Sequence, residues 1–494
     1  MDSKQSFEKH AKYVNFYHKK FANLDTNAES EEYWGLGIEN ESYLMFQEFD
    51  TVTREFIRNN RMPERYSVDY WRNFKTSQLV ETLKKLPAKM KVPLYINSYG
   101  FRKMDLLGEH MTLYTKGVKE NPMYSGQSID EYLRRVSPEF IEMFEKNVIY
   151  DGDTFEFATF NFYKANVIDT IDELKSVKAN FLAEINKRLV SKFTIFKKPL
   201  VYPQFNYGFV KYQTNQKNVG VCNNGTYHIN ITLPTKLKAG KIHDEAEFKA
   251  QHANAIRAIQ WIEPFLVGLY GSPDVLHLLD STYSGGSQRL NFSRYIGLGT
   301  YNSNKMEKGK LLDTFTYDNI GNQVSYFLKI HQKSPYIPPK TIGYDFNYNK
   351  FTRHGIELRI FDYFPEQYLE SVMNLIILVC QHSLLEPVPD PREDCLWNEL
   401  AADAITKGSD MKMSDKMIRR ISEIFDIGGL DRRYCLWPFS QSRKMKHVAK
   451  LLSSGLYTKY SKGPLSMKMS PNMKPIKIVD YNSIIKAEYK KLFL

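Results

Sequence analysis

Residues 35–46 read GLGIENESYLMF, an apolar stretch typical of a β-strand that carries Glu39 and Glu41 with a single residue between them. Because side chains alternate between the two faces of a strand, Glu39, Glu41 and Tyr43 share one face and Ile38 points to the other. Two carboxylates at this spacing lie roughly 6–7 Å apart, and they repel each other unless a cation lies between them. The stretch therefore predicts a strand with one apolar face and one face suited to a bound cation.

Three further stretches repeat this alternation of apolar and polar side chains. They are TFEFATF at 154–160, YHINITLP at 227–234 and GIELRIF at 355–361. Their polar faces carry Glu156 in the first stretch, His228, Asn230 and Thr232 in the second, and Glu357 and Arg359 in the third. Four strands of this kind can form one sheet whose polar side is lined by charge.

The residue types on these polar faces suit phosphate chemistry. Mg²⁺ prefers carboxylate oxygens and commonly keeps waters and substrate phosphates as its remaining ligands. The guanidinium of Arg359, always protonated and fork-shaped, suits a phosphate oxygen or a carboxylate. A nucleotide-dependent ligase needs both groups, because they neutralise the γ-phosphate while a substrate carboxylate attacks it and an amine then displaces phosphate from the acyl phosphate. Positioning and charge stabilisation supply most of such catalysis.

Each pattern also has a simpler explanation. A strand that is exposed on one side often carries Glu at alternate positions for solubility. His228 alone is more often a hydrogen-bonded structural histidine than a ligand, and Glu357 with Arg359 can be a surface ion pair worth under about 1 kcal/mol. The order and the chemistry of the four stretches together favour a shared site.

The first and last of these stretches resemble signature strands of the glutamate–cysteine ligase and carboxylate–amine ligase families, relatives of glutamine synthetase. Gly37, Glu39 and Glu41 are similar to the G-x-E-x-E strand that opens these families. GIELRIFDYF at 355–364 is similar to their last signature strand, E-x-R-x-x-D. The resemblance spans roughly residues 33–385, most of the chain.

The segments between these strands resemble the same families in the same order. Residues 154–175 are similar to a strand glutamate followed by a long helix, and YHINITLP is similar to a later strand with paired polar residues. Residues 252–274 resemble the helix that follows that strand. The implied fold is α+β, with a curved antiparallel β-sheet that is backed by long helices and holds ATP and two or three Mg²⁺ or Mn²⁺ ions.

The resemblance also implies a role for individual residues. The implied metal ligands are Glu39, Glu41, Glu156, His228 and Glu357. The implied nucleotide, phosphate or substrate groups are Asn230, Arg289, Arg294 and Arg359, and the implied catalytic residues are Arg359 and Glu39.

The order of the expected elements favours the same fold class. Strands are separated by long helical stretches without regular βαβ alternation, which favours an α+β fold with an antiparallel sheet over a doubly wound fold. A capping box at 128–131 predicts a helix through Lys146, and three-to-four spacing of apolar residues predicts a helix over 168–189. A long helix is expected over 245–270, interrupted late by Pro264.

Charge separates the C-terminal end from the rest of the chain. Of the net charge of +12, +10 lies from Arg443 onward, where twelve Lys and Arg residues accompany two acidic ones. We therefore expect a ligase-like catalytic domain with helical insertions over 1–442 and a basic C-terminal extension over 443–494. Residues 457–475 lack apolar periodicity, which predicts an extended or mobile tail. The basic end suits nucleic acid, anionic lipid or an acidic protein partner, and a solvated tail is the alternative.

Cysteines and hydropathy bear on the cellular compartment. The four cysteines are scattered without a C-x-x-C pair, which argues against a disulfide framework and a structural zinc site. The N-terminus lacks the apolar core of a signal peptide, and the longest apolar run, at 375–380, is far too short to span a bilayer. These features predict a cytoplasmic protein without a transmembrane segment, or a virion protein if the chain is viral.

Two functions remain open. The first is an ATP- and Mg²⁺-dependent carboxylate–amine ligase that joins a glutamate-like carboxylate to an amine acceptor through an acyl phosphate. The second is a ligase-like scaffold whose activity has decayed and which serves as a structural or assembly protein, such as a virion component. The basic end and the H-x-N form of the YHINITLP stretch motivate this alternative. A sequence-specific nucleic-acid binder is disfavoured, because no binding motif accompanies the charge.

Overall fold

The computed structural model describes the chain from Glu32 to Lys491 with gaps. The described residues are 32–47, 95–96, 98–103, 128–151, 154–190, 192, 196, 198–206, 225–238, 241–279, 281, 284–292, 297–308, 344–348, 355–428 and 444–491.

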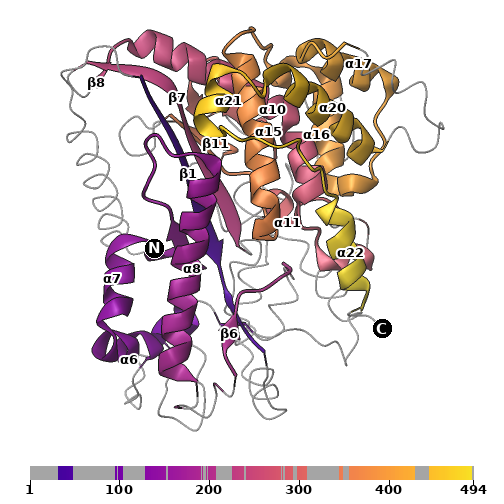
Figure 1. Cartoon of the computed structure of the whole chain (residues 1–494). Helices are drawn as coiled ribbons and strands as arrows, with labels where there is room; N and C mark the ends of the chain where they lie inside the picture. Colours follow the sequence, from indigo (N-terminus) through magenta and orange to yellow (C-terminus); the bar gives the residue numbers. More distant parts are fainter. Residues whose placement is uncertain are drawn as a thin grey trace.

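A seven-stranded antiparallel sheet lies at the centre of the described structure (Figure 1). Its main path runs β11–β12–β7–β1–β5–β4, and β8 pairs with β7. The strands are β1 (Glu32–Ser42), β4 (Val148–Asp151), β5 (Thr154–Ala158), β7 (Thr226–Lys238), β8 (Lys241–Ile242), β11 (Phe346–Tyr348) and β12 (Ile356–Leu358). The four stretches of alternating polarity lie on β12, β7, β1 and β5, which are neighbours in this order. The expected α+β class with an antiparallel sheet is therefore confirmed.

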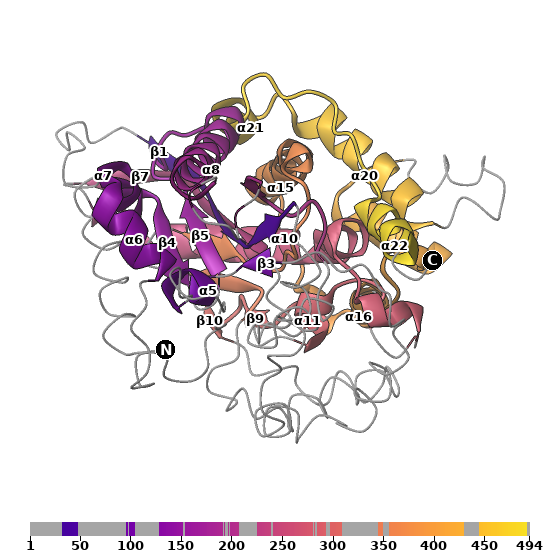
Figure 2. The ribbon, with the colours of Figure 1, turned by 90° about the horizontal axis from the view of Figure 1, so that it is seen from below.

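Long helices cover the apolar face of this sheet. α8 (Val167–Leu189) packs against β1 and β5, α10 (Glu245–Tyr270) packs against β7, and α15 (Leu369–Ser383) packs against both helices. Figure 2 shows α8 and α15 on the same side of the sheet. Leu36 and Ile38, which alternate with the glutamates of β1, belong to the core that these helices share. Burial of this apolar face provides the main driving force for the arrangement.

The remaining described elements surround this framework. The other helices before the C-terminal end are α5 (Ser98–Lys103), α6 (Ile129–Val136), α7 (Pro138–Lys146), α11 (Gln288–Phe292), α16 (Cys395–Lys407) and α17 (Asp415–Ile424), with short 3-10 turns η1 (Val275–Leu278), η4 (Glu366–Tyr368), η5 (Pro391–Glu393) and η6 (Gly408–Asp410). Two small sheets are formed by β2 (Leu44–Phe46), β3 (Tyr95–Ile96) and β6 (Leu200–Val201), and by β9 (Tyr301–Asn302) and β10 (Glu307–Lys308). Within the described ranges, no helix combines the length and apolar character that a membrane span requires.

The helix expected after the capping box divides into α6 and α7. The capping box itself is present, since Glu131 N–H donates to Ser128 Oγ at 3.1 Å and Ser128 N–H donates to Glu131 Oε2 at 3.0 Å. The Ser137 hydroxyl accepts the N–H of Phe140 at 3.1 Å and so begins a second helix, with Pro138 in its first turn. Proline is favoured there because that position needs no backbone N–H donor.

The C-terminal end is folded onto the rest of the molecule. It forms α20 (Met445–Tyr460), α21 (Pro464–Met469) and α22 (Tyr481–Lys491), and the first two pack against α15 (Figure 1). Leu465 and Tyr481 are fully buried in the same core as the sheet. The expectation of an extended or mobile tail over 457–475 is therefore wrong. Its few apolar residues dock onto neighbouring helices although they follow no regular period.

Candidate metal centre

The antiparallel register gathers polar residues from distant parts of the chain on one face of the sheet. β1 pairs with β7 so that Glu39 lies opposite His228 and Glu41 lies opposite Thr226. On its other edge, β1 pairs with β5 so that Glu41 lies opposite Glu156. Directly opposed residues point to the same face of a sheet. Two acidic groups result, and each draws on more than one strand.

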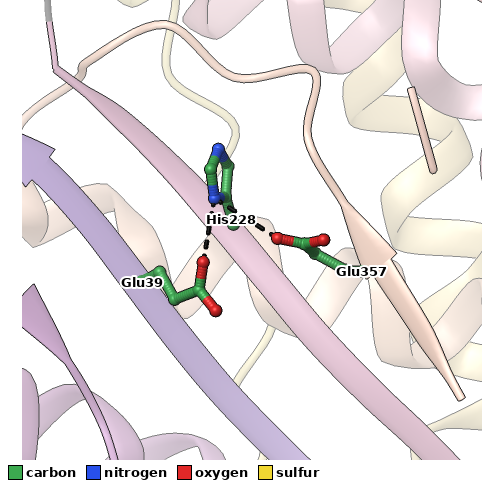
Figure 3. A group of neighbouring side chains, drawn as sticks. All are labelled: Glu39, His228 and Glu357. Atoms are coloured by element: carbon green, nitrogen blue, oxygen red, sulfur yellow. Dashed lines mark hydrogen bonds and ion pairs between the residues drawn. The ribbon is translucent and has the colours of Figure 1, made fainter. Parts of the chain in front are cut away.

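The first group contains Glu39, His228 and Glu357, which converge from β1, β7 and β12 (Figure 3). Nδ1 of His228 lies 3.0 Å from Oε2 of Glu39 and 3.4 Å from Oε1 of Glu357. One ligand atom from each of the three residues lies within 4.8 Å of the others. The sheet thus brings together three of the five expected metal ligands.

The second group contains Glu41, Glu156 and Asp151, again with ligand atoms within 4.8 Å of one another. Asp151 ends β4 and lies opposite Thr154 across the β4–β5 turn. No role in the site was expected for Asp151, although the acidic residues of DGD directly precede TFEFATF in the sequence. His228 links the two groups, because its Nε2 lies 3.7 Å from Oε1 of Glu41.

The carboxylates of both groups are shielded from solvent. The four glutamates and His228 are between 1% and 6% exposed, and Asp151 is half-buried. These glutamates therefore do not serve to keep an exposed strand face soluble. Burying a carboxylate costs several kcal/mol unless a cation compensates its charge. The arrangement requires positive charge close by, either from the chain or from a bound ion.

Two guanidinium groups lie beside these acids. Arg359 Nη1 lies 3.3 Å from Glu357 Oε2. Arg289, fully buried on α11, places Nη2 3.3 Å from His228 Nε2 and donates from Nε to the carbonyl of Arg359 at 3.2 Å. Because a guanidinium only donates hydrogen bonds, Nε2 of His228 is the acceptor. This network assigns the ring proton to Nδ1, which donates to Glu39.

Asp362 holds the segment that carries Arg289. Its Oδ1 accepts the backbone N–H of Arg289 at 3.0 Å, and its Oδ2 accepts the backbone N–H of Ser272 at 3.3 Å. Burial raises the pKa of Asp362 to about 6, although these hydrogen bonds and the Arg289 charge act in the opposite direction. Asp362 is the last residue of the E-x-R-x-x-D pattern, and sequence reasoning gave it no role in the site.

The other expected binding residues are placed as follows. Asn230 is half-buried on β7, opposite Gly37 on one side and Glu357 on the other. Arg294 lies outside the described residues. Asn347 on β11 was not expected, and it donates from Nδ2 to Oε2 of Glu357 at 2.9 Å. This bond occupies one oxygen of Glu357 and leaves Oε1 directed toward His228.

An aromatic ring explains the glycines that precede the glutamates on β1. A Cβ atom at Gly37 would lie 2.9 Å from Cδ2 of Phe162, and one at Gly35 would lie 2.0 Å from Cε1 of the same ring. A side chain at either position would displace the ring. Phe162 and Ala158 form a small core of their own, separate from the main one. The glycines thus let an apolar patch lie directly beside the carboxylates.

The donor atoms of the two groups fit hard divalent cations. Two carboxylates with an imidazole, and three carboxylates, are ligand sets that suit Mn²⁺ or Mg²⁺. A bound cation would also supply the positive charge that these buried carboxylates require. The site is therefore a candidate for two cations held side by side.

Comparison with known proteins places the chain in a family. No protein-family model matches it. It is 39% identical over 465 residues to "Uncharacterized protein R704" of Acanthamoeba polyphaga mimivirus, and the alignment covers 91% of this chain and 79% of the relative. The chain belongs to the family of that mimivirus protein. Identity at this level over most of both chains indicates a common fold.

Proposed function

We propose that the chain is an ATP- and divalent-metal-dependent carboxylate–amine ligase, with the curved sheet of the ligases related to glutamine synthetase. One observation carries the proposal: buried carboxylates from three separate stretches and a histidine from a fourth meet on adjacent strands, with two arginines beside them. Such a set suits two divalent cations and the phosphates that they bind. The expected ligands are ATP, a glutamate-like carboxylate and an amine acceptor.

In this proposal Glu39, His228 and Glu357 would hold one cation, and the group around Glu41 would hold the other. The cations would neutralise phosphate charge. If His228 held the cation through Nδ1, its ring proton would lie on Nε2. There Thr226 Oγ1, at 3.2 Å, can accept it, and Nε2 would no longer accept a hydrogen bond from Arg289.

Arg359 is the group that we assign to the transferred phosphoryl. It lies at the end of β12, partly accessible, and its guanidinium is already oriented by Glu357. In the reaction, an oxygen of the substrate carboxylate attacks the γ-phosphorus of ATP and ADP leaves. The amine then attacks the acyl carbon, phosphate leaves, the nitrogen loses one proton to solvent and the amide forms. Fixed positive charge stabilises both steps because the groups that supply it need not reorganise.

Metal and nucleotide binding test the proposal directly. We expect Mn²⁺ with a non-hydrolysable ATP analogue to raise the unfolding temperature of the wild-type chain, since a ligand stabilises the state that it binds. Glu39→Gln and Glu357→Gln should abolish this shift. Glu307→Gln, on the exposed strand β10, is the matched control and should keep it. The absence of any shift in the wild type would contradict the proposal.

A second candidate is the decayed ligase scaffold with a structural or assembly role. The pairing of Glu357 with Arg359 and the position of Arg289 beside His228 favour it, because the chain itself supplies positive charge near its buried carboxylates. For this candidate, Glu39→Gln should change the stability of the chain, and Mn²⁺ should bind neither the variant nor the wild type. The same titration therefore separates the two functions.

A further inference from the structure

A buried lysine lies behind the candidate metal centre. Lys178 is on α8, which covers the apolar face of the sheet, and its side chain is 3% exposed. Its Nζ donates to Oδ1 of Asn40 at 2.8 Å and pairs with the carboxylate of Glu366. The ring of Tyr202 lies 4.6 Å from Nζ, and its hydroxyl donates to the carbonyl of Lys178 at 2.9 Å. The ammonium is thus enclosed and held by specific partners.

Asn40 connects this lysine to the strand that bears the glutamates. It lies between Glu39 and Glu41 and points to the opposite face of β1. Its Nδ2 donates to the carbonyl of Thr226 at 3.0 Å and to the carbonyl of Glu41 at 3.3 Å. Glu41 and Thr226 are the last opposed pair of the β1–β7 ladder. Asn40 therefore holds together the end of the β1–β7 pairing, and Glu41, which belongs to the second acidic group, lies at that end.

Glu366 connects the same lysine to the chain segment that follows β12. It begins η4, shortly after the segment that carries Glu357 and Arg359. Lys178 thereby contacts β1 at Asn40, between Glu39 and Glu41, and contacts the segment that follows β12 at Glu366. A single ammonium thus joins the strand that carries Glu39 and Glu41 to the segment that leads on from Glu357.

Stability alone does not account for this lysine. Removing an ammonium from water costs several kcal/mol, and replacing a buried ion pair by apolar side chains of similar volume is often neutral or stabilising. Burial is also the main reason that the pKa of Lys178 is lowered. A buried ionic group can instead be retained because it specifies one arrangement of the elements that it joins.

We propose that Lys178 is a positioning residue, which through Asn40 and Glu366 sets the placement of Glu41 relative to Glu357. This inference rests on the proposed metal binding of the two groups. The polar partners of metal ligands are known to affect affinity strongly, since their loss typically costs about 10–100-fold. Lys178 acts indirectly, through its hydrogen bond to Asn40 on the strand that carries the ligands Glu39 and Glu41.

The test is a titration of the full chain with Mn²⁺ alone, followed by electron paramagnetic resonance and by thermal unfolding. Lys178→Met should unfold at a lower temperature, because it leaves Glu366 without its partner, and the weaker of its two Mn²⁺ ions should bind about 10-fold or more less tightly than in the wild type. The spin coupling between two neighbouring Mn²⁺ ions should change as well. Lys175→Met is the control, because Lys175 is exposed on the same helix and lies 4.0 Å from Asp172.

The outcomes separate this inference from the function that it rests on. If the wild type binds no Mn²⁺, both fail. If the wild type binds two ions and Lys178→Met binds them equally well, only the role of Lys178 is overturned. If Lys178→Met does not fold, Asn40→Asp decides, because it keeps a partner for Lys178 and loses the donor to Glu41 and Thr226. The added negative charge alone would strengthen cation binding, so weaker binding supports the positioning role and unchanged or stronger binding overturns it.

Discussion

His252 illustrates how burial and hydrogen bonding determine the protonation state of a single residue. It lies on α10 and is fully buried against β7. Its Nε2 accepts the backbone N–H of Leu233 at 3.1 Å, and its Nδ1 donates to the carbonyl of Phe248 at 2.7 Å. The bond from Leu233 requires a neutral ring, because a protonated Nε2 cannot accept it. Burial lowers the pKa of His252 to about 4, although the bond to Phe248 acts in the opposite direction.

This residue should make the fold sensitive to acid. A lowered pKa means that the unfolded chain binds the proton more tightly, so stability is lost as the pH falls from 6.5 toward 4. Between pH 7 and pH 5 we expect His252 to account for a loss of about 2 kcal/mol in the free energy of unfolding. His252→Gln should be less stable at pH 7 yet lose about 2 kcal/mol less on acidification, as measured by urea denaturation at both pH values.

His243→Gln provides the control for this measurement, because His243 is exposed at the start of the same region. It should retain the full pH dependence of the wild type. An identical pH dependence in His252→Gln and the wild type would show that the buried ring is not the group that titrates.

Alternation along single strands was enough to predict most residues of the site. It placed Glu39 and Glu41 on one face, and the same rule selected His228 and Glu357. It could not select Asp151, because that residue joins the group through the register of the β4–β5 hairpin, a pairing between strands. The buried position of Arg289 depends likewise on packing between distant segments.

At the scale of the element, β1 depends on the ring that packs against it. The G-x-E-x-E pattern was interpreted through its glutamates, but its glycine has a separate physical role. Phe162 occupies the space above Gly37, and the backbone N–H of Leu36 donates to the carbonyl of Phe162 at 3.0 Å. The segment after β5 thereby continues the pairing along β1.

A methyl group at Gly37 should disturb this contact. In Gly37→Ala the new Cβ would lie 2.9 Å from the ring of Phe162, and overpacking of this kind typically costs about 1–3 kcal/mol. The urea midpoint should fall accordingly, and adding Phe162→Leu should recover part of the loss. Gly428→Ala, with no atom within 4 Å of the new Cβ, should change stability by less than about 0.5 kcal/mol. Equal midpoints for Gly37→Ala and the wild type would exclude the proposed clash.

Helices with regular apolar spacing were predicted well, and their interruptions were not. The expected interruption at Pro264 is absent, because α10 continues to Tyr270. Proline removes the donor that would bond the carbonyl of Gln260, and the indole N–H of Trp397 donates to that carbonyl at 2.9 Å instead. A tryptophan more than a hundred residues away supplies the hydrogen-bond donor that the proline lacks. Local sequence patterns cannot predict such a contact.

At the scale of the whole molecule, the basic C-terminal end has two faces with different roles. Its apolar residues complete the common core, whereas Lys450, Lys462 and Lys474 are exposed. Charge composition predicted a surface for an acidic or nucleic-acid partner, and that remains a prediction. Composition could not predict the packing, because sparse apolar residues without a period are indistinguishable from a tail until their partners are known.

Asn482 on α22 is one of the residues that join this end to the body. Its Nδ2 donates to the carbonyls of Gly271, Gly285 and Gly286 at 3.1, 3.0 and 3.2 Å. Its Oδ1 accepts the backbone N–H of Ser409 at 3.2 Å. One amide therefore satisfies buried backbone groups from three segments that precede it in the chain.

Asn482→Ala should destabilise the whole molecule, because it leaves these buried carbonyls and the N–H of Ser409 without their partner. Each unsatisfied buried group costs about 1–3 kcal/mol, so a loss of about 3 kcal/mol or more in the free energy of unfolding is expected. Asn472→Ala, at an exposed position between α21 and α22, should change the free energy of unfolding by less than about 0.5 kcal/mol.

Removal of residues 443–494 should prevent folding altogether, since the core would lose three helices. A truncated chain that unfolds cooperatively at the wild-type temperature would instead make this end a separable appendage.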